Sequence, residues 1–160
     1  MNPYRLFSLV FSYPTEKTVA AVSEAVDDEA ALLTACVQQM QCTPLEQLQE
    51  EYTRLFINSY PTLLCPPYES FYRDGTLYGS SSAEVKEIYK TYGLDYTYEG
   101  EPPDLLSVEL DFLALTNDGA FLERLNGWIF AFTKRVKEHS GIYGPCAEEL
   151  EEFLRAAVAR

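Results

Sequence analysis

Pro66-Pro67-Tyr68-Glu69-Ser70-Phe71-Tyr72 is the first of two runs that organise this sequence, and the second is Glu101-Pro102-Pro103-Asp104-Leu105-Leu106-Ser107-Val108-Glu109-Leu110-Asp111-Phe112-Leu113. Both runs lie in the central stretch from Tyr60 to Leu115. Each places prolines beside a carboxylate and then continues with aromatic or aliphatic residues. Such runs can build a rigid, partly apolar and acidic surface feature without any catalytic apparatus.

Apolar residues recur at helical spacing through most of the rest of the chain. The pattern predicts helices over residues 4–13, 15–40, 43–56, 81–93, 102–115, 121–136 and 146–158, and the acidic patch at 27–29 divides the second of them. We find no strand alternation and no internal repeat. A chain of 160 residues fits one domain. The sequence therefore predicts an all-α, single-domain helical bundle over residues 1–160.

Three helix starts carry capping signals. Thr15 and Thr18 can cap the second helix, and Thr43 can cap the third, with Pro44 at the first helical position. The run Ser81-Ser82-Ala83-Glu84 has the spacing of a capping box. We therefore expect each of these helices to be capped by its own first residues.

The region from Ile57 to Gly79 lacks periodicity, and its prolines and glycines predict a loop rather than a helix. A connection of about 20 residues in a compact domain is usually functional or disordered. The many tyrosines argue against disorder. We expect a long ordered loop between the central helices, lying over the bundle.

The helix predicted over residues 102–115 is apolar on nearly all sides. A helix of this kind is normally buried at the centre of a domain. Glu109 and Asp111 are the acidic exceptions within it. If Glu109 faces inward it must be paired, and Arg54 or Arg73 could be its partner.

The charge balance excludes several classes of function. The chain has 25 acidic and 12 basic residues and a net charge of −13, without an extended basic cluster, which argues against nucleic-acid binding. No run is apolar and long enough to insert into a membrane, and the N-terminus lacks the layout of a secretory signal. We expect a cytoplasmic protein. The acidity serves either solubility or attraction for a basic partner.

The cysteines and the lone histidine offer no metal site or nucleophile. Cys36, Cys42, Cys65 and Cys146 form no closely spaced pair, and His139 is the only histidine. We expect free buried thiols, an exposed His139 at a helix end, and no bound metal or cofactor.

An enzyme is the least favoured reading of the acidic residues. Glu109 and Asp111 lie two apart in a helix, so their side chains point about 200° from each other and cannot easily share a substrate. Asp104 stands where a helix begins, and capping explains its position. No nucleophile elbow or phosphate-binding loop is present.

A binding site is the sharper hypothesis. Tyr68, Tyr72 and Tyr78, together with Glu69 and Glu101, could form a pocket that takes arginine side chains through carboxylate pairing and cation–π contact. An adjoining apolar groove between helices could accept an amphipathic segment. The alternative is that these tyrosines only pin the loop to the bundle.

The ordered set of motifs resembles the TorD/DmsD/NarJ family of redox-enzyme maturation chaperones. The matching runs are Leu9-Val10-Phe11-Ser12-Tyr13-Pro14, Glu51-Tyr52-Thr53-Arg54-Leu55-Phe56, Pro67-Tyr68-Glu69-Ser70-Phe71-Tyr72, Tyr89-Lys90-Thr91-Tyr92-Gly93-Leu94, Glu101-Pro102-Pro103-Asp104 and Glu109-Leu110-Asp111-Phe112-Leu113. They follow the family order through most of the chain. Each run alone is weakly specific, and together they are fairly specific.

The resemblance implies an all-helical cytoplasmic chaperone, not an enzyme, that binds the catalytic subunit of a molybdopterin reductase or dehydrogenase through its basic twin-arginine leader. Such a chaperone holds its client until the cofactor is inserted. Asp104 matches the Asp of an Asp-His pair that the family uses in leader binding, but Leu105 replaces the His. The residues expected to bind the client are Tyr52, Phe56, Pro67, Tyr68, Glu69, Ser70, Tyr72, Glu101, Pro102, Asp104 and Glu109.

A second hypothesis is a self-associating helical scaffold with no molybdoenzyme client. Some relatives exchange helices between protomers, and domain swapping is a low-cost route to a homodimer. For the chaperone hypothesis, we expect Glu69→Lys and Asp104→Lys to weaken binding of a basic leader without unfolding the domain.

Overall fold

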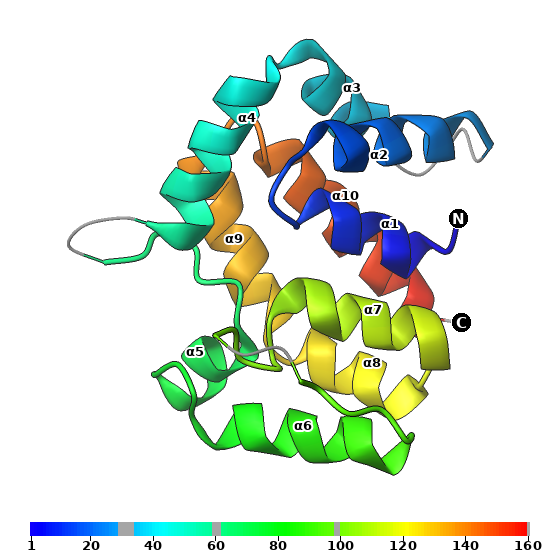
Figure 1. The fold of residues 1–160 in the computed structure, drawn as a ribbon, viewed down its shortest axis with the longest axis vertical. Coiled ribbons are helices and arrows are strands. Elements are labelled where there is room, and N and C mark those ends of the chain that lie inside the picture. Colours follow the sequence, from blue (N-terminus) through cyan, green and yellow to red (C-terminus); the bar gives the residue numbers. More distant parts are fainter. Residues whose placement is uncertain (29–33, 59–61, 98–99, 160) are drawn as a thin grey trace.

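The computed structural model describes residues 1–28, 34–58, 62–97 and 100–159, and their secondary structure is helical (Figure 1). The helices are α1 (Pro3–Val10), α2 (Glu16–Asp28), α3 (Thr34–Cys42), α4 (Leu45–Tyr52) with a π-helical continuation η1 (Thr53–Ile57), α5 (Glu69–Asp74), α6 (Ser80–Thr91), α7 (Leu106–Thr116), α8 (Gly119–Asn126), α9 (Ile129–His139) and α10 (Gly144–Val158). The described residues contain no named strand, and Tyr68 and Leu105 form an isolated antiparallel bridge. The all-α prediction is confirmed.

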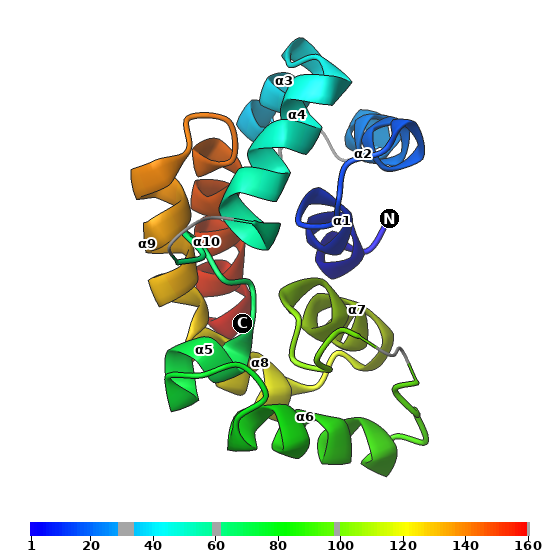
Figure 2. The same cartoon turned by 60° about the vertical axis from the view of Figure 1, so that its left-hand side comes forward.

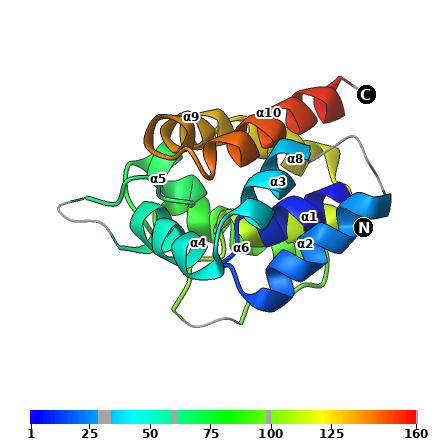
Figure 3. The same ribbon diagram turned by 90° about the horizontal axis from the view of Figure 1, so that it is seen from above.

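The helices pack around α1 and the α9–α10 pair. Helix α1 lies along α7 and is covered by α2, while α3 connects α2 to α10. Figure 2 shows α5 and α6 at the opposite end of the molecule from α3 and α4. In Figure 3, α9 and α10 lie on one side and α2 on the other, with α3 between them.

An aromatic cluster fills the space between α1, α4, α9 and α10. Tyr52 and Phe56 have ring centroids 4.8 Å apart, and both pack against Tyr143, at 6.1 and 5.5 Å. Phe132 is fully buried beside Phe56. Full burial of such a side chain contributes about 1.5–3 kcal/mol, so this cluster is a main source of stability for the bundle.

Helix α2 begins as predicted. The Thr15 amide donates to Thr18 Oγ1 at 2.8 Å, and the Thr18 amide donates to Thr15 Oγ1 at 3.2 Å, so the two threonines cap the helix reciprocally. The helix ends at Asp28, inside the acidic patch that was expected to divide the second helix. Glu29 lies outside the described residues.

Two other capping predictions are wrong. The Thr43 hydroxyl donates back to the Gln39 carbonyl at 2.6 Å, and Pro44 is the residue before the first helical position of α4 rather than that position. At α6 the Ser81 amide donates to the Asp74 carboxylate at 2.9 Å instead of to a local side chain. Capping by a carboxylate from another element satisfies the same free amides, which local sequence cannot reveal.

The predicted loop over residues 57–79 contains the short helix α5, which the number of prolines and glycines argued against. Pro66 and Pro67 precede α5 and Gly75 ends it, so none of the breakers interrupts the helix. Gly75 has φ 76°, a left-handed conformation that glycine adopts without a steric penalty. The described part of the connection is therefore ordered, as expected, but it is partly helical; Tyr60 and Pro61 lie outside the described residues.

Helix α7 is not buried all round. Leu106, Leu110 and Leu113 are fully or almost fully buried, but Leu115 on another side is 74% exposed. Val108 is half-buried. The prediction of a central helix with every face covered is therefore wrong, because the chain leaves one apolar side of α7 open.

The cysteines also differ from expectation. A disulfide joins Cys36 on α3 to Cys146 on α10, and both residues are fully buried. Cys65 is a buried free thiol, and Cys42 is a free thiol on the surface. The prediction of free buried thiols holds for Cys65 and is wrong for the other three. The bonded pair is 110 residues apart in sequence, so no local spacing indicates it.

Candidate functional site

The two motif runs cross each other, and their backbones hold them together. The Leu106 amide donates to the Pro67 carbonyl at 2.8 Å, and the Glu69 amide donates to the Asp104 carbonyl at 3.2 Å. Together with the bridge between Tyr68 and Leu105, these bonds make one rigid junction. The junction positions the start of α5 against the start of α7.

Asp104 caps a helix, although not the one expected. Its side chain is fully buried, and Oδ2 accepts a 2.7 Å hydrogen bond from the Ser70 amide in the first turn of α5. A carboxylate at this position satisfies a free amide and interacts favourably with the helix dipole. The expectation that Asp104 acts in capping is confirmed, but it caps α5 rather than its own helix α7.

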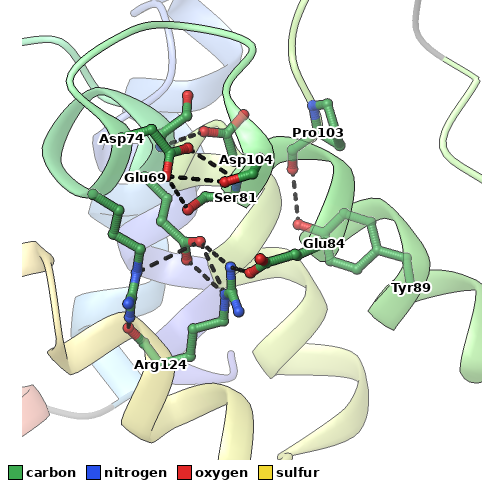
Figure 4. Close-up of polar contacts among 11 residues, drawn as sticks. Glu69, Asp74, Ser81, Glu84, Tyr89, Pro103, Asp104 and Arg124 are labelled. Atoms are coloured by element: carbon green, nitrogen blue, oxygen red, sulfur yellow. Dashed lines mark hydrogen bonds and ion pairs between the residues drawn. The ribbon is translucent and has the colours of Figure 1, made fainter.

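Glu69 forms a buried ion pair with Arg124 of α8 (Figure 4). Arg124 Nε lies 2.9 Å and Nη2 2.6 Å from Glu69 Oε2, and Nε lies 3.1 Å from Oε1. The Arg73 Nε atom adds a second cation at 3.7 Å, and Glu84 of α6 also contacts Arg124, at 2.8 Å. Burial raises the pKa of the Glu69 carboxyl, while Arg124 acts in the opposite direction. This cluster ties α5, α6 and α8 together.

Glu109 is fully buried on α7. Neither carboxyl oxygen has a hydrogen-bond partner among the described residues, and no ion pair to Arg54 or Arg73 forms. Burial raises the pKa of Glu109 well above its ordinary value, and the negative charges of Glu69 and Asp104 add to that rise. The neighbouring Arg124 and the Trp128 indole lower it in part. The carboxyl group therefore keeps its proton to a higher pH than an ordinary glutamate.

Arg54 and Arg73, the partners predicted for Glu109, bind other groups instead. Arg54 donates to Glu51 at 2.6 Å and to the His139 carbonyl at 2.7 Å. Arg73 donates to the Arg124 carbonyl at 2.7 Å. His139 is exposed at the end of α9, as expected.

Tyrosine hydroxyls anchor the second motif run. Tyr68 donates to Glu101 Oε2 at 2.7 Å, Tyr96 donates to the Glu101 carbonyl at 2.9 Å, and Tyr89 donates to the Pro103 carbonyl at 2.9 Å. Burial is the main cause of the raised pKa of Tyr68. These bonds hold Glu101 in the lining of a pocket, while its neighbours Pro102 and Pro103 are buried.

We call this space the acidic pocket; it has a volume of about 650 Å³ between α6 and the segments around residues 95–97 and 100–103. Its lining includes Tyr78, Ser82, Lys86, Asp95, Tyr96 and Glu101. These side chains include two carboxyl groups, Asp95 and Glu101, and one lysine, Lys86. The pocket is thus negatively charged, aromatic on part of its wall, and suited to a guanidinium group.

The predicted site residues divide between this pocket and the interior. Tyr78 and Glu101 line the acidic pocket, and Tyr68 supports it from behind through its bond to Glu101. Tyr72 instead stacks on Trp128 with ring centroids 5.7 Å apart. Pro67, Glu69, Ser70, Asp104 and Glu109 are brought together but are buried, so they shape the junction rather than form its surface.

Tyr52 and Phe56 belong to the aromatic core. The Tyr52 hydroxyl donates to the Phe11 carbonyl at 3.0 Å. Burial raises the pKa of Tyr52, and the Glu101 carboxylate adds to the rise.

Sequence reasoning missed Arg124, Asp74 and Tyr89. Arg124 and Glu69 are 55 residues apart, and no periodic pattern relates them. The sequence offers one indirect indication: a glutamate in an ordered, proline-flanked segment requires a cation nearby if it is buried. This rule predicts a basic partner for Glu69, but it does not say which arginine or lysine that partner is.

The described residues were also compared with the requirements of a metal site and of a membrane span. They contain no cluster of three or more His, Cys, Asp or Glu side chains that could hold a metal ion. None of their helices is long and apolar enough to cross a membrane. What the arrangement can do is present fixed carboxylates and aromatic rings to a positively charged ligand.

Comparisons with known proteins identify the family and a similar structure. Residues 19–154 match the family model described as nitrate reductase delta subunit. A crystal structure assigned as a redox enzyme maturation protein from Archaeoglobus fulgidus is 41% identical in sequence, with a TM-score of 0.86 over 95% of this chain and 91% of that chain. No curated protein sequence matches significantly.

Proposed function

The chain belongs to the nitrate reductase delta subunit family of NarJ/TorD-type chaperones, and from that premise we propose that it binds the basic twin-arginine leader of a molybdopterin oxidoreductase catalytic subunit. The family is one of redox enzyme maturation chaperones for molybdoenzymes, not a catalytic family. In this proposal the chaperone works in the cytoplasm and holds its client for cofactor insertion before export or membrane assembly.

The acidic pocket is the observation that carries the proposal. Glu101 and Asp95 lie on its wall beside the Tyr78 and Tyr96 rings, in a chain of net charge −13. An arginine of the leader could pair with either carboxylate and lie over a tyrosine ring. The overall negative potential would speed the encounter with a basic segment and disfavour acidic ones.

The buried junction supports the same function by keeping the pocket rigid. Glu101 is held by Tyr68, and the run that follows it is anchored by Tyr89 and by the capping bond from Ser70 to Asp104. A preformed pocket loses little conformational entropy on binding, which favours affinity. The buried residues of the predicted site therefore take part in binding as supports for the surface groups.

Leu105 stands where the resemblance leads one to expect a histidine. Its backbone forms the bridge to Tyr68, an interaction that needs no imidazole. We infer that leader binding by this chain does not depend on the titration of a side chain at position 105.

Capture of the client tests the function. The tagged chain is expressed in its native host during anaerobic growth, and the proteins that co-purify are identified by mass spectrometry. We expect a molybdopterin catalytic subunit that still carries its leader, and we expect much less of it with a Glu101→Lys chain than with a Glu87→Lys chain. Recovery of the tagged chain alone, in dimers or larger assemblies, would instead favour the self-associating scaffold.

A further inference from the structure

Glu109 of α7 is a buried carboxyl group that the fold does not pair. Its side chain has no exposed surface, and both of its oxygen atoms lack a hydrogen-bond partner among the described residues. A lone charge in such a place is costly, so a buried carboxyl group without a cation is more stable in its neutral form. The structure therefore accommodates Glu109 as an acid that carries its proton.

The surroundings of Glu109 are more acidic than basic. The titratable and charged side chains that act on it or respond to it come from several elements, and they are Glu69 of α5, Tyr89 of α6, Asp104 before α7 and Arg124 of α8. Glu69 and Asp104 oppose a charge on Glu109, whereas Arg124 favours it. On the side of α1, Arg5 is already paired with Asp111 of α7 at 2.7 Å.

Arg124 cannot neutralise Glu109 without leaving another carboxylate. Its Nε and Nη2 atoms lie 2.9 and 2.6 Å from Glu69 Oε2 (Figure 4). The Arg73 Nε atom lies 3.7 Å from the same oxygen, and Arg73 Nη2 donates to the Arg124 carbonyl at 2.7 Å. Both arginines of this cluster are thus committed to Glu69, and an ionised Glu109 would remain uncompensated.

Asp104 connects this cluster to the start of α5. Its Oδ2 atom accepts the 2.7 Å hydrogen bond from the Ser70 amide, and its Oδ1 atom is buried and accepts no bond within the described part of the chain. A charge on Glu109 would repel the Asp104 carboxylate through a medium of low dielectric. The cap of α5 is therefore the contact that a charge on Glu109 would weaken first.

We propose that Glu109 is a proton-operated lock on the motif junction. With its proton in place, Glu109 leaves Asp104 to cap α5; without the proton, repulsion loosens the bond between Asp104 and Ser70 and releases the first turn of α5. Tyr68 precedes this turn and holds Glu101 in the acidic pocket through its 2.7 Å hydrogen bond. The lock therefore governs one wall of the pocket, whatever ligand the pocket takes.

The lock weakens as pH rises. Burial, reinforced by Glu69 and Asp104, raises the pKa of Glu109 well above 4.5 in the closed junction, and contact with water in an opened junction returns it toward that ordinary value. Opening therefore releases a proton between these two pKa values. In that window the open fraction grows by up to about tenfold per pH unit, and below pH 4.5 the junction is closed to its full extent.

Hydrogen exchange at the Ser70 amide measures the lock. Protection of this amide is followed by NMR from pH 5 to 8, with correction for the intrinsic exchange rate, in the wild type and in Glu109→Gln and Glu109→Met. The two variants remove the titrating proton with a polar and an apolar side chain, and Glu87→Gln, at an exposed glutamate of α6, is the matched control. The Phe121 amide, which donates to Asp118 at 2.8 Å at the start of α8, is the control within each protein.

We expect the protection of the Ser70 amide to fall by up to about tenfold per pH unit in the wild type and in Glu87→Gln. In Glu109→Gln and Glu109→Met it should not depend on pH, because opening no longer releases a proton. The Phe121 amide should keep its protection throughout.

Three results would overturn the lock. A protection of Ser70 that is constant with pH in the wild type would show that the Glu109 proton is not linked to the cap. A fall that persists in both Glu109 variants would assign the pH dependence to another group. A parallel fall at Phe121 would show that the proton is released by unfolding of the whole domain and not by opening of the junction. Because the two amides are compared within the wild type, the test stands even if a variant fails to fold.

Discussion

At the scale of single residues, the interior of the motif junction holds more carboxyl groups than cations. Glu69, Asp104 and Glu109 are all fully buried, and Arg124 is the cation in bidentate contact with one of them. A buried ion pair is costly to break, because the remaining charge is left without a counterion in a medium of low dielectric. The lysine substitutions suggested by the sequence, at Glu69 and Asp104, would therefore unfold the junction instead of acting only on leader binding.

Substitution of Arg124 should show how much the buried ion pair contributes to the free energy of unfolding. Arg124→Met leaves Glu69 buried beside the more distant Arg73, and we expect it to lower the free energy of unfolding by about 3–5 kcal/mol. The control is Glu84→Gln, which removes only the exposed carboxylate on the same guanidinium and should cost less than about 1 kcal/mol. Urea denaturation followed by circular dichroism measures both. Equal effects of the two substitutions would show that the buried Arg124–Glu69 pair contributes no more to stability than the exposed Arg124–Glu84 pair.

Glu101, unlike these buried residues, lines the acidic pocket. Glu101→Gln keeps an oxygen that can accept the Tyr68 hydrogen bond while it removes the charge from the acidic pocket. We expect binding of an Arg-Arg leader peptide to weaken about threefold to fivefold at low salt, and the difference to shrink as salt screens the charge. Fluorescence anisotropy across a salt series is the measurement. A loss of affinity of the same size in Glu87→Gln would assign the effect to net charge.

Glu109 makes stability depend on pH. Its pKa in the folded protein is well above the ordinary value of 4.5, so the stability that it contributes is fully present below pH 4.5 and is lost as pH rises through the raised pKa. Glu109→Gln mimics the protonated form, and we expect the variant to gain stability over the wild type as pH rises from 5 to 8. Melting temperatures across this range test the expectation, with Glu87→Gln as the control. A constant difference between variant and wild type would contradict it.

At the scale of elements, helix ends in this chain are completed by distant carboxylates. Asp74 caps α6, Asp104 caps α5, and Glu149 on α10 accepts bonds from the Ala35 and Cys36 amides at the start of α3, at 2.8 and 3.4 Å. Burial raises the pKa of Glu149. Each of these caps also joins two elements, so one hydrogen bond both satisfies a helix end and holds two parts of the fold together. Helix α3 is attached to α10 by the disulfide as well as by its cap.

The Cys36–Cys146 bond should stabilise the attachment of α3 to α10. It closes a loop of 110 residues, and a cross-link of this span stabilises a protein by about 2–4 kcal/mol, chiefly by restricting the unfolded chain. We expect dithiothreitol to lower the melting temperature of the wild type. Cys146→Ser should melt lower and no longer respond to dithiothreitol, and Cys42→Ser, at the exposed free thiol, should behave as the wild type does. A wild-type protein that is indifferent to the reductant would contradict the expected contribution.

At the scale of the whole molecule, the sequence predicts what local periodicity determines. The helices α1, α2, α6 and α10 follow from apolar residues at helical spacing, and the reciprocal Thr15–Thr18 cap follows from residue type. The single helix predicted over residues 121–136 is wrong, because the chain breaks at Gly127 and Trp128 into α8 and α9 while the apolar pattern runs on across the break. Helix α5 could not be predicted in this way, because it is short and its first turn is satisfied by Asp104, 34 residues away. Its existence depends on the junction, which forms only in the folded chain.

The candidate site, like the fold, could be predicted from the sequence only in part. The sequence identified the two runs that meet and the acidic, aromatic character of their surface. It could not show that Glu69 and Asp104 point inward while Glu101 lines the pocket, since all three are carboxylates beside prolines or aromatic residues. The exposure of Leu115 on α7 was not predicted, because an apolar residue at the surface fits the same helical pattern as one in the core.

The disulfide also makes the central part of the polypeptide a covalent ring. Cys36 and Cys146 bracket both motif runs, from Pro66 to Leu113, so the acidic pocket and the motif junction both lie inside the ring. A protease that cuts the backbone once between these cysteines opens the ring but separates no fragment. The nicked protein would keep its full mass on a non-reducing gel and fall into two pieces only after reduction, and a client leader bound across the cut would still be held by one molecule.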